Sequence, residues 1–365
     1  NGAYFFRNFL TTAQFAISVI LFVSAVFVVR QMNMMQYSKL NEAGDQIISI
    51  RYGGFSGSAT NDDYNTFKNS LLSNPDIEAI TLANHLPRLD YFGGIGYQFQ
   101  FPELSEETYD FNQLNGDFDF PSTFDMELIA GRTFDSENVS DSSAILINEA
   151  ALRSLGIEPN EAIDLAIITP IYNPDTDSLD YDQGLQGHII GVVKDFPYMS
   201  MYNEIEPLTI SPRPDQMDRI IHVKASSGAI SSVIEQLDET WREQFSGFGF
   251  DYWFVNDEFA RMYENEKQIA GLTEKFSLLA ILITCVGLYG MASFMATQKT
   301  KEIGIRKALG ASVGQITGLL LAVFVKLLLI ASVIGIPIAY LISKEWLSGF
   351  VYQTPLSVWV FGGAL

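Results

Sequence analysis

Few side chains in this sequence have the type and spacing that chemistry at a site requires. The one cysteine, Cys285, lies in the middle of an apolar run, so it has no internal disulfide partner and is expected to pack as a small hydrophobic side chain. The three histidines, His85, His188 and His222, are scattered, and none has a second ligand at metal-binding spacing. We therefore expect structural roles for them, with no metal site and no catalytic residue.

Two short runs look like ligand-binding loops but have the wrong spacing. The Asp-rich run 173–184 suggests a calcium loop, yet the EF-hand spacing requires Gly at its sixth position and Glu at its twelfth, which here are Ser178 and Gly184. A solvated hairpin turn is the better interpretation. The glycine-rich run 93–96 is not followed by a helix with a further Gly at dinucleotide-binding spacing, and no G-x-x-x-x-G-K-[ST] occurs. The sequence thus predicts no cofactor and gives an enzyme no positive support.

Charge is divided unevenly along the chain. Over 365 residues the net charge is -21, while the mean hydropathy is +0.14. Residues 31–270 hold 40 acidic and 13 basic side chains, a net charge of -27, whereas the remaining residues hold 3 acidic and 9 basic, a net charge of +6. An acidic block is therefore separate from an apolar, weakly basic part. The acidity also argues against a nucleic-acid partner, because neutralising phosphates takes clustered Lys and Arg.

The apolar part contains four runs with almost no charge. Residues 9–29 and 276–296 are each 21 residues without a charge, enough to cross a hydrocarbon core of about 30 Å at about 1.5 Å per residue. The run 319–342 is interrupted only by Lys326, which can snorkel to the headgroups. A fourth run, 357–365, reaches the last residue. We predict three transmembrane helices and the start of a truncated fourth.

The first run also has an interpretation as a signal peptide, because it lies near the N-terminus. Its apolar stretch exceeds the usual length of about 7–15 residues, only Arg7 precedes it, and the residues after Arg30 offer no small-residue cleavage site. A retained helix is favoured. Because the sequence lacks an initiator Met and ends inside an apolar run, we expect it to be a piece of a longer protein.

Basic residues predict the orientation in the membrane. The segment between the second and third apolar runs carries four Lys or Arg and one Glu, and such residues concentrate in short cytoplasmic loops. We therefore expect residues 1–8 and 297–316 to be cytoplasmic, and residues 30–275 and 343–356 to be extracytoplasmic.

The block 30–275 alternates strand and helix patterns, which predicts an α+β extracytoplasmic domain. Strand-like segments are 46–52, 77–83, 143–147, 188–193, 208–210 and 219–224, and helical segments are 63–73, 148–155 and 230–245. The stretch 91–131 has weak periodicity and is interpreted as an inserted subdomain. A further helical segment, 258–275, is expected to continue into the second transmembrane helix as a stalk.

The most informative segment is the basic one, T-K-E-I-G-I-R-K-A-L-G-A-S at 300–312. As a short helix it would pair Glu302 with Arg306 at i, i+4 and would end at Gly310 as its C-terminal cap. Gly304 costs such a helix up to about 1 kcal/mol, which is easier to understand if another backbone comes close. The alternative is a basic hairpin that touches lipid headgroups. The physics of the sequence alone does not decide between the two.

This run resembles the signature of FtsX-like, MacB-type ABC transporter permeases, in which it follows the second transmembrane helix. Other stretches agree with the resemblance: R-N-F at 7–9, A-G-R-T-F at 130–134, I-L-I-N-E-A-A at 145–151 and G-V-V-K-D-F at 191–196. The order of a helix, a large domain and then three helices agrees too. The resemblance covers essentially the whole chain and is closest to the second half of a duplicated permease.

The resemblance implies a role for the basic segment as the coupling helix that docks on a separate ATPase subunit. The ATPase-coupling residues that it implies are Lys301, Glu302, Ile303, Gly304, Ile305, Arg306, Lys307, Ala308, Leu309 and Gly310. It further implies that residues 30–275 form a periplasmic core domain with a porter-like portion and an inserted subdomain. In such permeases ATP-driven closure is thought to move the stalks and rearrange the extracytoplasmic domains, which is called mechanotransmission. No ATPase domain is fused here, so the ATPase is expected in trans.

Two functional hypotheses follow from the resemblance. The first is a non-catalytic permease subunit of an ABC transporter, multi-pass in the cell inner (plasma) membrane with its large domain periplasmic, that serves export, efflux or the handling of envelope molecules. The alternative is a membrane-anchored sensor or regulator, such as an activator of a cell-wall hydrolase. The expected partners are an ATP-binding subunit in trans, a second permease half or a second copy, a periplasmic adaptor or outer-membrane partner, and membrane lipid.

Overall fold

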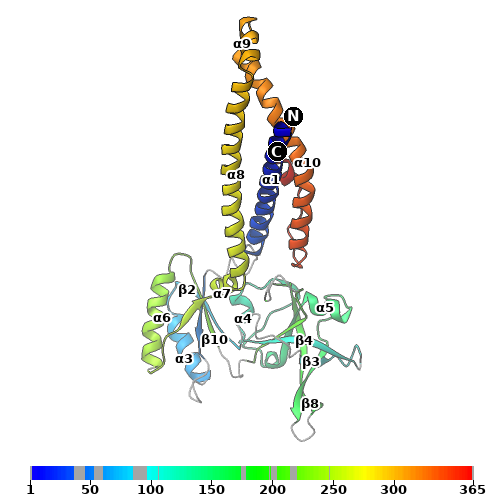
Figure 1. Cartoon of the computed structure of the whole chain (residues 1–365). Helices are drawn as coiled ribbons and strands as arrows, with labels where there is room; N and C mark the ends of the chain where they lie inside the picture. The colour runs from blue at the N-terminus through cyan, green and yellow to red at the C-terminus, as the bar shows by residue number, and fades with distance from the viewer. Residues whose placement is uncertain are drawn as a thin grey trace. The chain divides into compact units, whose positions relative to one another are not determined.

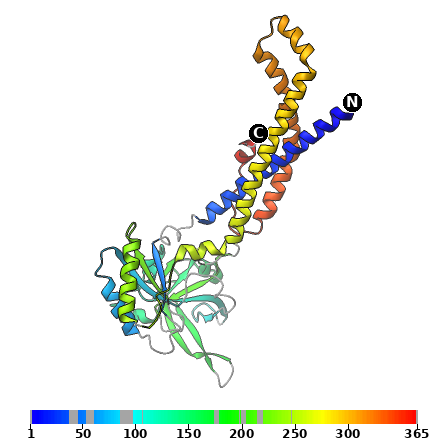
Figure 2. The same ribbon diagram turned by 60° about the vertical axis from the view of Figure 1, so that its left-hand side comes forward.

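The chain forms two compact units. A computed structural model describes residues 2–36, 46–52, 61–84, 97–105, 107–173, 178–196, 198, 204–213, 220–245 and 247–363. One unit consists of residues 1–36 and 263–365, which include the apolar runs, and we call it the helical unit; the other consists of residues 37–262, which include most of the acidic block, and we call it the α+β unit. Both units can be followed in Figure 1 and, from a second direction, in Figure 2.

The α+β unit contains a four-stranded antiparallel sheet with the strand order β11-β1-β10-β2. Its strands are β1 (Ile47–Arg51), β2 (Ile77–Ala83), β10 (Ile220–Ala225) and β11 (Tyr252–Phe254). A helix follows the first strand of each half, α3 (Asn61–Leu71) after β1 and α6 (Ile230–Gln244) after β10. Two β-α-β halves that interlock in one antiparallel sheet are the ferredoxin-like arrangement.

Both helices pack on one face of this sheet because their apolar residues recur every three or four positions. In α6 the buried residues are Val233, Leu237 and Trp241. Trp241 is fully buried and meets Phe67 of α3 nearly edge-on, with ring centroids 5.7 Å apart. Tyr52, which follows β1, contacts the same indole at 6.5 Å. Aromatic pairs in such geometry add about 0.5–1.5 kcal/mol beyond burial, so this cluster anchors the sheet to its helices.

A second, seven-stranded sheet is inserted between β2 and β10. Its order is β5-β8-β6-β9-β4-β3-β7, and β7 also pairs with β8, so the sheet returns on itself. Its strands are β3 (Tyr97–Gln100), β4 (Thr108–Asn115), β5 (Leu128–Gly131), β6 (Ala144–Asn148), β7 (Ala166–Asn173), β8 (Ser178–Val193) and β9 (Leu208–Ser211). The short helices α4 (Phe120–Thr123) and α5 (Glu149–Leu155) and the 3-10 turn η1 (Val139–Ser143) connect them.

The inserted subdomain is larger than the predicted stretch 91–131. The strands in that stretch, β3, β4 and β5, pair with β7, β9 and β8, which come later in the chain. The insertion is therefore the whole region from 84 to 219. Local periodicity could not reveal this, because β4 pairs in parallel with a strand almost a hundred residues away.

Asp117 ties the insertion to the four-stranded sheet. Its N–H donates to the carbonyl of Leu82 in β2 at 2.8 Å, and its carboxylate accepts from the hydroxyl of Tyr64 at 2.6 Å and from Lys68 Nζ at 3.1 Å. The hydroxyl of Thr81 donates to the other carboxylate oxygen. Burial, followed by the nearby Asp117 charge, raises the pKa of Tyr64, which keeps this phenol a hydrogen-bond donor.

The helical unit is built from three long helices: α1 (Gly2–Gln36), α8 (Glu264–Gln298) and α10 (Val313–Leu347). Each contains one of the predicted spans 9–29, 276–296 and 319–342 and extends beyond it at both ends. All three are long and apolar enough to cross a membrane. Since α10 continues to Leu347, the connection that follows it is shorter than the predicted 343–356, and the last helix is α11 (Val358–Gly363).

The predicted stalk 258–275 is divided between two helices. α7 (Val255–Met262) ends in the α+β unit and α8 begins at Glu264, with the non-helical Tyr263 between them. Glu264 and Glu266 occupy the first turn of α8, where the positive end of the helix dipole favours carboxylates. Asp257 and Glu258 occupy the first turn of α7, so the acidic pair Glu264 and Glu266 was the sequence signal that a second helix begins inside the predicted stalk.

Within the helical unit, α1 lies beside both α8 and α10 (Figure 1). The hydroxyls of Ser18 and Thr284 are 2.7 Å apart, and Ser277 Oγ donates to the carbonyl of Leu21 at 3.0 Å. On α10 the fully buried Ala331 and Ala339 face the same bundle. Small and hydroxylated residues at the contacts are typical of helices that pack in lipid, where close backbone approach replaces the hydrophobic effect.

Candidate functional site

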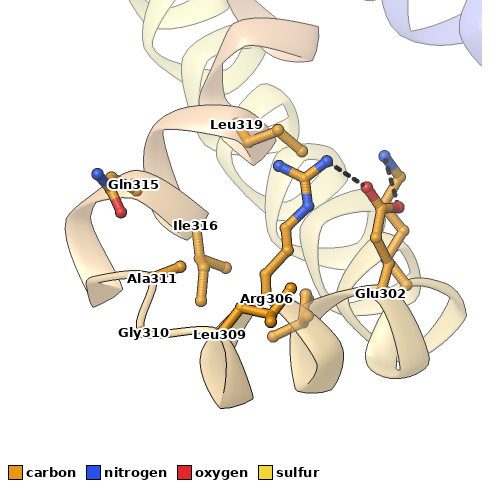
Figure 3. Close-up of a pocket in the computed structure, with 10 residues that line it drawn as sticks. Glu302, Arg306, Leu309, Gly310, Ala311, Gln315, Ile316 and Leu319 are labelled. Carbon is orange, nitrogen blue, oxygen red and sulfur yellow. Dashed lines mark hydrogen bonds and ion pairs between the residues drawn. The ribbon is translucent and has the colours of Figure 1, made fainter.

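The basic segment forms a corner between α8 and α10 that contains a short helix, α9 (Thr300–Ala308). Only Lys299 separates α9 from α8, and the backbone hydrogen bonds continue across it. The Lys299 N–H donates to the Met295 carbonyl and the Ile303 N–H donates to the Lys299 carbonyl, each at 2.9 Å. We call residues 298–316 the α9 corner; Figure 3 shows its inner side. α9 is therefore an almost continuous extension of α8.

A Schellman motif ends α9. Gly310 has φ +89°, a conformation that glycine adopts without the steric penalty of a Cβ. Its N–H donates to the Lys307 carbonyl at 3.1 Å, and the Ala311 N–H donates to the Arg306 carbonyl at 3.0 Å. These are the two bonds of the motif. The predicted end of the helix at Gly310 is confirmed.

A capping box begins α10 directly afterwards. The Ser312 N–H donates to Gln315 Oε1 at 3.0 Å, and the Gln315 N–H donates to Ser312 Oγ at 3.3 Å. Sequence analysis missed this pair, although S-x-x-Q before an apolar run is a known start pattern. The two motifs together fix the turn between α9 and α10 with hydrogen bonds at both helix ends.

The inner side of α9 faces the first turns of α10 across a cleft of about 380 Å³ (Figure 3). The cleft is lined by Lys299, Glu302, Ile303, Arg306, Leu309, Gly310, Ala311, Gln315, Ile316 and Leu319. Arg306 Nη2 lies 2.8 Å from Glu302 Oε1, as the i, i+4 spacing predicted, and Lys299 Nζ lies 3.7 Å from Glu302 Oε2. These side chains are solvent-exposed, so each pair contributes only about 0.3–0.5 kcal/mol.

The outer side of α9 presents the other half of the predicted coupling residues. Five of the ten do not line the cleft, namely Lys301, Gly304, Ile305, Lys307 and Ala308, and no residue of α9 is buried. Ile305 is 63% exposed and Leu309, at the edge of the cleft, is 82% exposed. A Cβ built on Gly304 would meet nothing within 4 Å among the described residues. The outer side of α9 therefore combines exposed apolar side chains, open space above Gly304 and lysine charge. Such a surface is suited to contact with a protein partner.

Two of the histidines, His188 and His222, lie in strands of the α+β unit. His222 is fully buried in β10, its Nδ1 is 2.9 Å from Ser49 Oγ, and burial lowers its pKa to about 3. His188 lies in β8, opposite Ala144 of β6 in the strand pairing. Cys285 is an exposed residue of α8. His85, the run 93–96 and positions 174–177 of the Asp-rich run lie outside the described residues. Across the parts of the chain that the structure describes, no cluster of His, Cys, Asp and Glu could hold a metal.

The motif I-L-I-N-E-A-A at 145–151 serves to cap a helix. Asn148 Oδ1 accepts from the N–H groups of Ala151 at 3.0 Å and Leu208 at 2.9 Å, which joins the start of α5 to β9. Asp195, from G-V-V-K-D-F, accepts from the Ala150 N–H at 3.0 Å and from Arg153 Nη2 at 2.6 Å. Both motifs of the seven-stranded sheet therefore meet at one helix N-terminus.

The motif A-G-R-T-F at 130–134 supports a loop. Arg132 donates both terminal nitrogens to the fully buried carboxylate of Asp141, at 2.5 and 2.8 Å. Asn138 Nδ2 and the Asp135 N–H donate to the same carboxylate at 2.9 Å. The hydrogen bonds from Arg132 hold the pKa of Asp141 below its ordinary value, so the carboxylate stays charged.

Comparison with known proteins finds two family models that match successive parts of the chain. The model described as MacB-like periplasmic core domain matches residues 9–240, and the one described as FtsX-like permease C-terminal matches residues 275–365. The first alone covers more than half of the chain. The chain belongs to the MacB/FtsX-type family of ABC transporter permeases. It is accordingly a membrane permease with an extracytoplasmic domain.

Individual MacB-type relatives match shorter stretches. The probable export ATP-binding/permease protein MacB of Pseudomonas entomophila (strain L48) is 30% identical over 161 residues, which are 39% of this chain and 24% of that protein. The probable syringafactin export ATP-binding/permease protein SyfD of Pseudomonas syringae pv. tomato is 32% identical over 125 residues, 33% of this chain and 18% of that protein. The chain thus matches a quarter or less of the length of these curated relatives.

Two solved structures are similar to part of the chain. The periplasmic region of MacB from Actinobacillus actinomycetemcomitans aligns with a TM-score of 0.41 and 15% identity, covering 62% of this chain and 96% of that one. The extracellular domain of the ABC-type transporter YknZ from Gram-positive bacteria aligns with a TM-score of 0.38 and 14% identity, covering 57% of this chain and 98% of that one.

Proposed function

We propose that this permease couples ATP hydrolysis by a separate ATP-binding subunit to movement of its extracytoplasmic domain, with the α9 corner as the docking element. The observation that carries the proposal is the outer side of α9, where Ile305 is 63% exposed and Gly304 has open space above it. A helix that buries none of its residues against its own chain gains stability from a partner. The ten residues 301–310 are the proposed ATPase-coupling segment.

The connection from α9 to the α+β unit supports transmission of force. α8 is 35 residues long, which is about 52 Å at about 1.5 Å per residue. It has no Pro, and its first residue, Glu264, follows the last helix of the α+β unit by one residue. A displacement of α9 would therefore be carried along a single rigid element to the start of the extracytoplasmic domain.

Topology and partners belong to the same proposal. The basic α9 corner is cytoplasmic, α1, α8 and α10 cross the inner membrane, and α11 begins a fourth crossing. Catalysis of ATP hydrolysis is assigned to the ATP-binding partner, which the matches to permease domains support. Much of the apolar surface of α8 is uncovered, which supports packing against a second permease half or a second copy. The word "export" in the names of the relatives supports export as the process.

The test places a large side chain on the outer side of α9. We expect Gly304→Trp to lower ATP-binding subunit retained on purified full-length chain at least tenfold and to abolish permease-dependent stimulation of its ATPase activity. The same substitution at Gly249, which also has nothing within 4 Å of its Cβ but lies in the α+β unit, is the matched control and should change neither. Membrane insertion should be equal in both variants.

A charge reversal tests the inner side. Glu302→Lys replaces the one carboxylate between Lys299 and Arg306 with a third cation, so the cleft should open and coupling should fall. If the ATP-binding subunit binds and is stimulated normally in both Gly304→Trp and Glu302→Lys, the α9 corner is not the docking element.

A further inference from the structure

The contact between α1 and α8 is made mostly by small and polar residues, and we call it the α1–α8 seam (Figure 1). Its members are Thr11, Gln14, Ser18 and Leu21 on α1 and Ser277, Ala280, Thr284, Gly287 and Met291 on α8. At about 100° per residue, each set falls within about 80° of one helix face. Successive members are three or four positions apart on both helices. A movement of α8 by one helical turn would therefore bring one seam face opposite the other again.

The hydrogen bonds of the seam define one register of two antiparallel helices. Ser18 Oγ lies 2.7 Å from Thr284 Oγ1, and Thr11 Oγ1 donates to Met291 Sδ at 3.4 Å. The Thr284 hydroxyl donates to the Ala280 carbonyl at 2.7 Å, so the Thr284 oxygen remains as an acceptor and Ser18 is the donor to it. We call this arrangement the first register.

Gln14 has an unused donor in the first register. Its side chain lies over Gly287, where an added Cβ would be 2.8 Å from Gln14 Oε1. Its Nε2 atom is buried and has no hydrogen-bond partner among the described residues. Gln14 belongs to the apolar run 9–29, where water does not supply an acceptor. An unpaired amide donor in such surroundings costs free energy, so a nearby arrangement that supplies an acceptor is favoured.

A slide of α8 by one turn toward the N-terminus of α1 supplies that acceptor. Gln14 and Ser18 are four positions apart, so a displacement of about 6 Å carries Thr284 from Ser18 to Gln14. The Ser18 hydroxyl then faces the Ala280 carbonyl, from which it is 3.4 Å away in the first register. Both donors have an acceptor in this second register.

Packing favours the first register. Met291 and Met295 are buried there in a cluster that contains Phe15 of α1 and Leu327 of α10. A slide separates these methionines from their neighbours, and this loss offsets the hydrogen bond that Gln14 gains. A slide in the opposite direction would offer Gln14 only the thioether of Met291, which is a weak acceptor. Two arrangements that differ by one turn and balance in this way are a known form of helix switching.

We propose that α8 moves along α1 between two registers one turn apart. The Thr284 hydroxyl oxygen accepts from Ser18 in the first register and from Gln14 in the second. Because α9 is an almost continuous extension of α8, the slide displaces α9 by the same distance of about 6 Å. That the ATP-binding subunit drives the slide rests on the proposed function, whereas the two registers do not depend on it.

The test measures the distance between two spin labels on the full chain in lipid nanodiscs by double electron–electron resonance. Phe6→Cys near the start of α1 and Leu272→Cys near the start of α8 carry the labels at exposed positions, and Cys285→Ser removes the natural thiol. The second register shortens this distance by about 6 Å. Labels at Phe6→Cys and Val333→Cys, an exposed position of α10, form the control pair and should keep their distance.

Two substitutions in the seam should shift the populations of the registers in opposite directions. Ser18→Ala removes the donor of the first register and should raise the population at the shorter distance about 3- to 10-fold, the effect of one interhelical hydrogen bond in lipid. Gln14→Leu removes the donor of the second register and should lower that population by a similar factor. Unaltered distances in both variants would overturn the two registers. A longer distance in Ser18→Ala would also do so, because α8 would then move the opposite way.

A second measurement separates the slide from the docking of the ATP-binding subunit. With the subunit bound and trapped by MgATP and vanadate, the wild-type chain should shift toward the shorter distance, because the slide carries α9 toward the subunit. Gln14→Leu should block this shift while the subunit stays bound. No shift in the wild type, or an equal shift in Gln14→Leu, would overturn this use of the slide. If the subunit binds Gly304→Trp normally and Ser18→Ala still shortens the distance, docking at α9 is wrong and the two registers stand.

Discussion

Two glycines of the α9 corner should respond in opposite directions to the same substitution. Gly310 has φ +89°, and its Cβ would meet nothing within 4 Å, so Gly310→Ala adds only the backbone penalty of an L-residue in a left-handed conformation. That penalty is about 1–2 kcal/mol. This penalty destabilises the conformation in which the two Schellman hydrogen bonds join α9 to the turn before α10. The local opening equilibrium should therefore rise about 5- to 30-fold.

Gly304→Ala is the matched control, because its Cβ is equally free but its backbone is helical. There the methyl group reduces the entropy of the unfolded segment, which should stabilise α9 by about 0.5–1 kcal/mol. The local opening equilibrium constant should therefore fall about two- to fivefold.

Amide hydrogen exchange of peptides from the α9 corner, measured on the full chain in detergent, reads both effects. Gly310→Ala should accelerate exchange at the Gly310 and Ala311 amides, and Gly304→Ala should slow exchange within α9. If both variants shift exchange in the same direction, the assignment of Gly310 to a left-handed cap is refuted. Unchanged exchange in both would show that the corner is held by something other than its caps.

Other predictions concern the α+β unit. Trp241→Ala should destabilise it by about 3–5 kcal/mol, since the indole is fully buried among rings, while Trp359→Ala, 88% exposed on α11, should change thermal unfolding little. Burial lowers the pKa of His222 to about 3 in the folded chain, from an ordinary 6.5. Between these two pH values the unfolded chain binds a proton that the folded chain does not. The free energy of unfolding should therefore fall by about 1.4 kcal/mol per pH unit as pH falls below 6.5. Ser49→Ala with His222→Phe should flatten thermal stability between pH 6.5 and pH 4; a profile as steep as wild type would contradict this origin.

Sequence patterns predicted the elements whose hydrophobic period or cap chemistry is strong. β2 has the predicted bounds 77–83, α6 differs from 230–245 by one residue, and the cap that ends α9 contains the predicted Gly310. The Glu302–Arg306 pair follows from helix spacing and was predicted as well. In each case neighbours within a few residues of one another determine the structure.

Features that depend on distant residues could not be predicted in this way. The order of the seven-stranded sheet depends on pairings such as β4 with β9, which no local pattern encodes. The packing of α1 against α10 depends on which side of each helix meets the other, and an apolar span has too few polar residues to mark that side. The cleft beside α9 was not predicted for a related reason. It exists only because the chain turns between α9 and α10, and the capping box of Ser312 and Gln315 helps to fix that turn.

The insertion between β2 and β10 also has a consequence for how the chain folds. The two halves of the ferredoxin-like sheet are separated by residues 84–219, and β10 is a central strand, so β1 and β2 cannot pair with it until this long segment has been synthesised. Closing a loop of this length costs about 3 kcal/mol more than closing a five-residue turn. A prefolded insertion removes most of that cost, because Asp117 holds its start against β2. The seven-stranded sheet therefore acts as an internal template, and the extracytoplasmic domain is expected to assemble from its middle outward. The edges of its N-terminal strands stay unpaired until β10, in the last fifth of the domain, has been synthesised.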